Sequence, residues 1–495
     1  MGIPSYFRKI IQAHPGCVSS TAPVDTVALC FDFNCLIYRC IRAPSMPSFP
    51  EEAEEHEAWE TALLEEVCKT VKEVWTTAGK PSQVLLAVDG VVPMAKIRQQ
   101  RVRRFKSAWL RGNSPVAAWD SNAITPGTAF MDRLTVALES LAKKHRGWIV
   151  SGVRQEGEGE HKIMHWLRAT MPTKPVIIYG LDADLIVLSM LVSEELGIPL
   201  WLLREKQEFG VTEGVSAVQE YAFMNIAELK AKLFISGYSM VLNYVALMSL
   251  MGNDFLPHSL THKLADDGHE LVLRELRSMT PKWQLVSDGK LQVNVLKDIA
   301  LRWASEEDTR MMHMIQKKRR PGRPVEDPNE LLPLKWNVEA ELLEGTGLHA
   351  EWRKVYYRWM HPSVDIHRVC QEYVYGCQWI LDYYTGKTSI NVNWIFPYWI
   401  PPLWSDLSKY SGNEESSYDT SAAPTPEEQL AMVLPLASWG LIRDVGLKKA
   451  PIVFPQLWPS SFTFFSAGRK WLWECEARIP VVTAGRLREL LMKVK

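Results

Sequence analysis

Short apolar runs alternate with longer amphipathic segments through the first half of the chain. The apolar runs include TVALCFDF, QVLLAVDG, GWIVSGV, PVIIYGLDADLIVL and PLWLLRE. Strands that alternate with helical patterns are typical of α/β units, in which helices connect and cover a parallel sheet. The pattern therefore predicts an α/β fold with a mostly parallel central sheet and flanking helices.

The second half is dense in aromatic residues between positions 352 and 404, in stretches that predict helix followed by loop. Two polar pieces flank this region, Lys317–Glu330 (KKRRPGRPVEDPNE) and the loop 411–428. Their content of Pro, Ser and charged residues disfavours regular structure. We expect a largely helical, aromatic-rich region packed against the first half, with a linker or exposed insertion and a flexible loop at these two pieces.

Composition and charge narrow the classes of function. The 495 residues are 47% hydrophobic and 23% charged, as in a folded globular protein. The net charge of −1 means that any phosphate-binding surface must be local. No apolar run approaches the roughly 18 residues that cross a bilayer, and the start of the chain lacks a signal-peptide layout. We expect an intracellular protein without membrane contact, nuclear or cytoplasmic. The basic stretch KKRRPGRP fits an import signal, an RNA contact or an ordinary solvated loop.

Acidic residues stand at the ends of apolar runs or in Gly-rich turns, where a solvated face is not expected. The set is Asp32, Asp89, Glu158, Glu160, Asp182, Asp184 and Asp254. Several follow predicted strands at their carboxyl ends, where open α/β sheets build their sites, so these side chains should converge. Clustered carboxylates raise one another's pKa unless a cation lies among them.

Oxygen ligands favour hard ions, so the acidic set predicts a site for Mg²⁺ or Mn²⁺, ions that activate water and neutralise phosphate charge in phosphoryl transfer. The eight cysteines form no paired CxxC set of the kind that binds zinc, and buried free thiols are the simpler interpretation. Taken alone, a motif such as GEGE or DAD is more typical of a helix cap or a polar surface. Several in order favour the metal site.

A basic segment, MAKIRQQRVRRFKSAWLR, follows Asp89. On a helix, Lys96, Gln100, Arg103 and Arg104 share one face. Arginine forks match phosphate oxygens, so this face is a candidate phosphate pocket. The alternative is a solvated helix whose charges pair with acids elsewhere.

Taken together, the motifs resemble those of the XRN family of 5′→3′ exoribonucleases, within the flap-endonuclease-like, PIN-related nucleases. The resemblance lies in MGIPSYFRKI, FDFNCLIY, DGVVPMAKIRQQRVRRF, GEGEHKIMHWLR, YGLDADLIVLSM, LLREKQEFG, LMSLMGNDFLPH, QEYVYGCQWILDYY, IFPYWIPPLWSDL and EEQLAMVLP. It implies a nuclease core over 1–265, a connecting region over 266–345, and the family's second characteristic region over 346–495. The long C-terminal extension of the large members is not matched, so protein partners cannot be carried over.

The resemblance also implies roles for individual residues. The acidic set matches the family's catalytic metal ligands, and Lys96, Gln100, Arg103 and Arg104 match its 5′-monophosphate pocket. The expected activity is processive hydrolysis of single-stranded RNA with a 5′-monophosphate to mononucleotides, in RNA degradation such as mRNA decay. Tyr38 stands where the family has a base-stacking His, and Trp394 and Trp379 are candidates for a second stacking partner.

Two other classes of function remain. A structure-specific DNA flap nuclease uses a similar acidic cluster, but MGNDFLPH is not followed by a helix-hairpin-helix pattern. A catalytically silent RNA-binding paralogue would keep the fold and lose at least one acid, whereas the complete set is present here.

Overall fold

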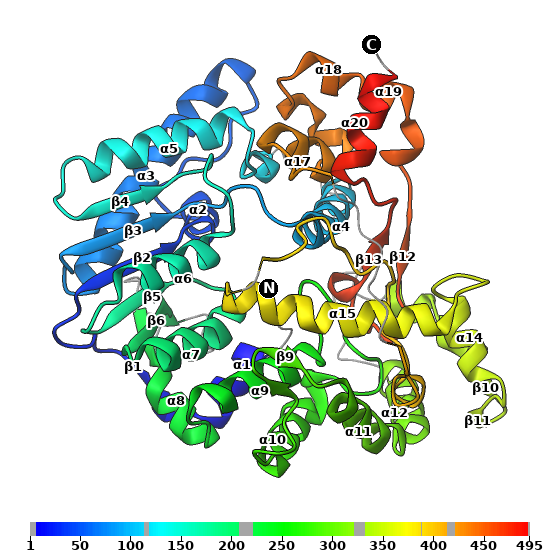
Figure 1. Cartoon of the computed structure of the whole chain (residues 1–495). Helices are drawn as coiled ribbons and strands as arrows, with labels where there is room; N and C mark the ends of the chain where they lie inside the picture. Colours follow the sequence, from blue (N-terminus) through cyan, green and yellow to red (C-terminus); the bar gives the residue numbers. More distant parts are fainter. Residues whose placement is uncertain are drawn as a thin grey trace.

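The computed structural model describes residues 6–112, 118–206, 221–320, 332–387, 389–412 and 421–493. Within these ranges, seven strands form one sheet in the order β1-β7-β6-β5-β2-β3-β4 (Figure 1). Five strands are parallel: β2 (Ala28–Asp32), β3 (Gln83–Ala87), β4 (Trp148–Ser151), β5 (Val176–Tyr179) and β6 (Leu200–Glu205). At one edge, β7 (Tyr221–Asn225) pairs antiparallel with β6, and β1 (Val18–Ser19) pairs antiparallel with β7. The predicted mostly parallel sheet is confirmed.

Both faces of the sheet are covered, because the central strands are apolar at successive positions. In β2, Cys30 contributes to the core on one face, and Leu29 and Phe31 contribute to the core on the other. The first face packs against α6 (Gly159–Thr170), α7 (Asp184–Leu196) and α9 (Tyr238–Ser249), and the second against α2 (Asn34–Ile41), α3 (His56–Thr77) and α5 (Ala129–Ala142). Burying one such aliphatic or aromatic side chain contributes about 1.5–3 kcal/mol. This two-sided burial fixes the strand ends, and with them the loops that follow.

The second half is mainly helical, as expected. Its longest helix, α15 (Ile366–Thr385), runs towards α6 and joins the core on the α9 side of the sheet (Figure 1). The helix α11 (Val293–Ala304) packs against α16 (Trp404–Leu407), where Trp303 and Trp404 meet edge to face with ring centres 4.8 Å apart. Aromatic residues therefore form much of the packing in this half.

The other helices are α1 (Tyr6–Ala13), α8 (Ile226–Leu233), α10 (His269–Ser278), α12 (Glu307–Arg319), α13 (Leu332–Lys335), α14 (Trp352–Arg358), α17 (Pro426–Val433), α18 (Val445–Lys448), α19 (Ala450–Val453) and α20 (Ala484–Met492). Short strand pairs join β8 (Val286–Ser287) to β9 (Lys290–Leu291), β10 (Leu343–Glu344) to β11 (Gly347–Leu348), and β12 (Thr463–Phe465) to β13 (Glu476–Arg478).

The helix α4 (Met94–Arg111) lies between the sheet and the C-terminal segment (Figure 1). Part of its positive charge binds backbone carbonyls of the second half of the chain. Arg98 donates to the Phe396 carbonyl at 2.7 Å, and Lys106 donates to the carbonyls of Trp473 and Cys475 at 2.7 and 2.8 Å. The buried Arg101 donates to the carbonyls of Pro480, Met432 and Leu457. The helix α4 is therefore neither wholly solvent-exposed nor wholly available to phosphate, because Arg98, Arg101 and Lys106 bind the second half of the chain.

No single helix in the described ranges is long and apolar enough to span a bilayer; α8 and α9 pass that test only as a pair, and they are bent by 80° at the break between them.

Several predicted features fall wholly or partly outside the described residues. These are the start of the chain (1–5), part of LLREKQEFG (207–210), most of the basic insertion (321–330) and the centre of the predicted loop (413–420). The division at 265 and 345 stays a prediction.

The role of Arg101 in docking predicts a stability effect. In Arg101→Met, three backbone carbonyls lose the donor of a buried guanidinium, so the free energy of unfolding should fall by about 3 kcal/mol. Urea denaturation measures the change. Lys69→Met is the control: Lys69 is 56% exposed and pairs with Glu66 and Glu73 on the surface of α3, so its replacement should change stability by less than about 0.5 kcal/mol. Equal stability of the two variants would contradict the docking role.

Candidate active site

The predicted acidic residues follow strands or begin helices at one edge of the sheet. Asp32 ends β2, and Asp89 comes two residues after β3. Asp182 lies in the short turn between β5 and α7, and Asp184 starts α7. Glu158 and Glu160 stand at the start of α6, which follows β4, and Asp254 lies beyond the end of α9. The carboxyl ends of parallel strands share an edge, so the fold brings these side chains together.

Gly159 allows α6 to approach this edge closely. A Cβ at Gly159 would lie 2.5 Å from Asp32 Oδ1 and 2.8 Å from the Ala87 carbonyl oxygen. Its backbone N–H donates to Asp89 Oδ1 at 2.7 Å. The second Gly of GEGE therefore lets Glu158 and Glu160 stand beside Asp32 and Asp89.

Lys96 from α4 lies among these carboxylates. Its Nζ is 2.5 Å from Glu158 Oε2 and 2.8 Å from Asp254 Oδ2, and all three side chains are nearly fully buried. Burial alone would lower the pKa of Lys96, but Asp254 and Glu158 raise it well above its usual value. The side chain predicted to bind phosphate therefore also serves as the protein's own counterion for two predicted metal ligands.

One lysine does not neutralise the cluster. Burial, followed by Glu158 and Asp184, raises the pKa of Glu160 well above its usual value. Burial and Asp254 raise the pKa of Asp184 to about 7. Glu160 Oε2 is buried and has no hydrogen-bond partner among the described residues. A divalent cation with oxygen ligands would neutralise the excess negative charge and bind the unpartnered oxygen of Glu160. The site therefore fits such an ion.

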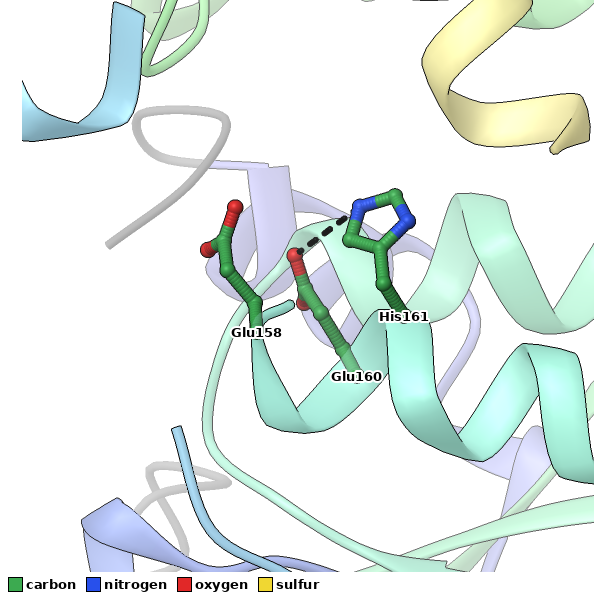
Figure 2. Close-up of side chains that lie close together, drawn as sticks. All are labelled: Glu158, Glu160 and His161. Carbon is green, nitrogen blue, oxygen red and sulfur yellow. Dashed lines mark ion pairs between the residues drawn. The ribbon is translucent and has the colours of Figure 1, made fainter. Parts of the chain in front are cut away.

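Figure 2 shows Glu158, Glu160 and His161 at the start of α6. One ligand atom from each lies within 4.8 Å of the others, and His161 Nε2 is 3.9 Å from Glu160 Oε1. Burial lowers the pKa of His161 to about 3, so the ring is neutral and able to offer a nitrogen ligand. The sequence analysis missed His161, although it directly follows GEGE.

The predicted phosphate-binding residues have different surroundings. Gln100 and Arg104 are buried, whereas Arg103 is half-buried and lies near Asp182. Arg104 donates from Nη1 to Asn122 Oδ1 at 2.9 Å and from Nη2 to the Ile124 carbonyl at 3.3 Å. Arg104 is thus fixed by the protein itself, while its Nε has no partner among the described residues.

The predicted stacking residues also differ. Tyr38 on α2 is half-buried and lies near Arg104, whose pKa burial lowers to about 10. Trp379 and Trp394 are only 2% and 4% exposed and belong to the core, where Trp379 stacks on Tyr383 with ring centres 5.0 Å apart. Protein atoms cover both rings in this structure, and a base-stacking role for Trp379 or Trp394 stays a prediction.

Two family models match the chain. Residues 1–206 match the N-terminus of XRN 5′-3′ exonucleases, and residues 350–495 match the Xrn1 helical domain. The chain is 27% identical to 5′-3′ exoribonuclease 1 of Homo sapiens, over 99% of this chain and 34% of that protein. It is 28% identical to 5′-3′ exoribonuclease 2 of Saccharomyces cerevisiae, over 62% of this chain and 39% of the relative. The chain belongs to the XRN family.

The chain spans between about a third and two fifths of the length of these two relatives. Among solved structures, a bacteriophage T5 flap endonuclease in complex with DNA and metal ions matches with a TM-score of 0.32 and 10% identity, over 72% of this chain and 89% of that one.

Both matched regions of this XRN-family chain contribute to the site. From α15, in the Xrn1 helical domain, the Tyr383 hydroxyl donates to Glu158 Oε1 at 2.8 Å, and the Tyr384 hydroxyl donates to Asp184 Oδ2 at 3.0 Å. Tyr383 also stacks on His161 with ring centres 3.8 Å apart. These two positioning residues were not found from the sequence, where DYY offers no signal beyond aromatic density.

The central position of Lys96 predicts a stability effect without any divalent ion. In Lys96→Met, with EDTA at neutral pH, Glu158 and Asp254 lose their counterion, so the free energy of unfolding should fall by about 3–5 kcal/mol. The loss should shrink as pH falls, because a carboxyl whose pKa is raised in the folded state destabilises only when ionised. Urea denaturation at several pH values measures both effects, with Lys69→Met as the surface control. A pH-independent loss would show that the ion pairs are not its cause.

Proposed function

We propose that this chain is a divalent-metal-dependent 5′→3′ exoribonuclease. It hydrolyses single-stranded RNA that carries a 5′-monophosphate, processively and to mononucleotides, in RNA degradation or processing. The observation that carries the proposal is the continuity of the acidic cluster with the basic face of α4, joined at Lys96. Family membership and the names of the relatives, 5′-3′ exoribonucleases 1 and 2, support the same activity.

The spacing along α4 explains why single nucleotides would be removed from the end. At 1.5 Å per residue, Gln100 and Arg103 lie about 6 and 10 Å further along the helix axis than Lys96. A terminal phosphate held near Gln100 and Arg103 places the next phosphodiester beside the carboxylates. A cap would have to fit among buried side chains, since Gln100 and Arg104 are both 6% exposed.

Mg²⁺ or Mn²⁺ is the proposed ion, held by carboxylates from Asp32, Asp89, Glu158, Glu160, Asp182, Asp184 and Asp254. When bound, it would supply activation of water and neutralisation of charge on the scissile phosphate. Tyr383 and Tyr384 orient two of these carboxylates, and the neutral ring of His161 lies within reach as a further ligand. Tyr38 is the proposed stacking surface for an early base.

The reaction itself is tested with RNAs of one sequence that differ only at the 5′ end. With Mg²⁺, the 5′-monophosphate RNA should be lost rapidly to mononucleotides, while the 5′-hydroxyl and capped RNAs should persist, because the terminal phosphate places the scissile bond. EDTA should stop the reaction. A time course of products on a denaturing gel, with a flapped DNA in parallel, measures this. Preferred cutting of the flapped DNA would support a flap nuclease, and RNA binding without cutting would support a silent paralogue.

The metal assignment predicts the effect of a single isosteric change. Asp182→Asn should lower the rate of RNA hydrolysis by at least about 100-fold, because an amide is a weaker ligand without charge. RNA binding, measured by fluorescence anisotropy, should remain, since the basic face of α4 is intact. Asp288→Asn, on an exposed turn far along the chain, is the matched control and should retain the wild-type rate. RNA hydrolysis by Asp182→Asn at the wild-type rate would contradict the assignment of Asp182 as a metal ligand.

End selection is tested at Arg103. Arg103→Ala should reduce the preference in kcat/KM for 5′-monophosphate over 5′-hydroxyl RNA by about 10- to 100-fold, the loss of a charge-assisted hydrogen bond of about 1.5–3 kcal/mol. Arg111→Ala removes a charge two turns further along α4, where Arg111 pairs with Asp120 at 2.6 Å, and should keep the preference. An equal preference in both variants would place the terminal phosphate elsewhere.

A further inference from the structure

A cavity of about 440 Å³ adjoins the acidic cluster on a neighbouring flank of α4. Its walls are the α4 side chains Gln99, Val102 and Lys106, the segments 251–258 and 263–265, Tyr398, and part of the segment 469–476. It shares Arg103 and Asp254 with the candidate active site, but Lys96, Gln100 and Arg104 do not line it. The cavity is therefore distinct from the candidate active site and shares two lining residues with it.

The cavity walls carry more cations than carboxylates. The cations are Arg98, Arg103, Lys106, Lys263 and Arg469, and the carboxylates are Asp254, Glu474 and Glu476. All three carboxylates have protein partners: Asp254 binds Lys96 and Gln99, Glu474 accepts from two backbone N–H groups, and Glu476 pairs with Arg469. The remaining positive potential favours an anion.

One cation of the cavity wall, Arg469, is incompletely satisfied. Arg469 is 2% exposed, and its Nε has no hydrogen-bond partner among the described residues. Burial, followed by the nearby Arg469, lowers the pKa of Lys263 to about 8. The half-buried Lys263 and the buried Arg469 repel each other, and the ion pair of Arg469 with Glu476 compensates only part of their charge, so this end of the cavity suits a phosphate group.

An aromatic side chain lines the same cavity. Trp473 is 64% exposed, although large aromatic residues are normally covered, and its backbone carbonyl is held by Lys106 at 2.7 Å. Tyr398 lines the cavity as well and is half-buried. An exposed indole beside basic side chains is the combination that binds a base and a phosphate together, with stacking worth about 1–3 kcal/mol per base.

We propose that this cavity binds a nucleoside 5′-monophosphate, with the base on Trp473 and the phosphate towards Lys263 and Arg469. The inference rests on the proposed function, because a mononucleotide is the product of that reaction. Arg103 and Asp254 border both compartments, so a released mononucleotide has a basic cavity beside the site in which it forms. The volume falls within the range of about 300–1,000 Å³ that is typical of small-molecule sites.

Calorimetric titration of the full chain in EDTA tests the site, with adenosine 5′-monophosphate, adenosine and ribose 5-phosphate as probes. The nucleotide should bind at least ten-fold more tightly than either fragment, because only it reaches both Trp473 and the two cations Lys263 and Arg469. Trp473→Leu should weaken nucleotide binding at least ten-fold and leave ribose 5-phosphate binding unchanged. Lys263→Gln should weaken both. Trp473 is exposed, so its variant keeps the test valid even if Lys263→Gln does not fold.

Gln100→Ala separates the cavity from the terminal-phosphate face of α4. If the nucleotide binds in the cavity, this variant should retain wild-type nucleotide affinity. Loss of affinity in Gln100→Ala with none in Trp473→Leu would place the nucleotide on the α4 face and overturn the inference. No binding of the nucleotide by wild-type protein would overturn it as well.

A short RNA with a 5′-monophosphate distinguishes free product from the end of a chain. In EDTA, its affinity should be the same in Trp473→Leu and in wild type, whereas a ten-fold loss would make the cavity a subsite for the RNA end and overturn the product assignment. The inference and the proposed function fail separately. If the protein hydrolyses RNA but Trp473→Leu does not change nucleotide binding, only the cavity assignment is rejected. If Trp473→Leu weakens nucleotide binding but the protein does not hydrolyse RNA, only the exoribonuclease proposal is rejected.

Discussion

The ion pairs of Lys96 with Glu158 and Asp254 are the interaction on which the rest of the site depends. Carboxylates gathered at the edge of the sheet repel one another, and burial strengthens the repulsion. A single ammonium group cancels part of this charge and joins α4, the start of α6 and the segment after α9. The same lysine places the basic face of α4 beside the acids, so charge compensation and the geometry proposed for RNA have one origin.

The helix α4 has three functions on different sides. One side carries Lys96, Gln100 and Arg104 towards the acidic residues, a second binds C-terminal carbonyls through Arg101, and a third lines the cavity at Gln99 and Lys106. Docking of the C-terminal segment on α4 therefore also forms the cavity, because Arg469 and Trp473 come from that segment. The second matched region acts on the acids as well, through the hydroxyls of Tyr383 and Tyr384.

Much of this arrangement could be predicted from local pattern. The apolar runs predicted the parallel strands, and the rule that sheet sites form at strand carboxyl ends predicted that Asp32, Asp89 and Asp182 converge. The contacts that could not be predicted from the sequence join residues that are far apart along the chain. Tyr383 meets Glu158 across 225 positions of the chain, and the docking role of Arg101 depends on carbonyls more than 300 positions away. Composition alone did not separate Trp379, which the core covers, from Trp473, which stays exposed.

We propose that the cluster around Lys96 is a divalent-metal site whose charge the protein alone only partly compensates. A crystal structure with Mn²⁺, using its anomalous scattering, tests this most directly. We expect Mn²⁺ among the carboxylates at oxygen-ligand distances, with Lys96 Nζ moved away from Glu158 or Asp254. An intact Lys96 ion pair and no anomalous peak at the cluster, at a Mn²⁺ concentration that supports RNA hydrolysis, would contradict it.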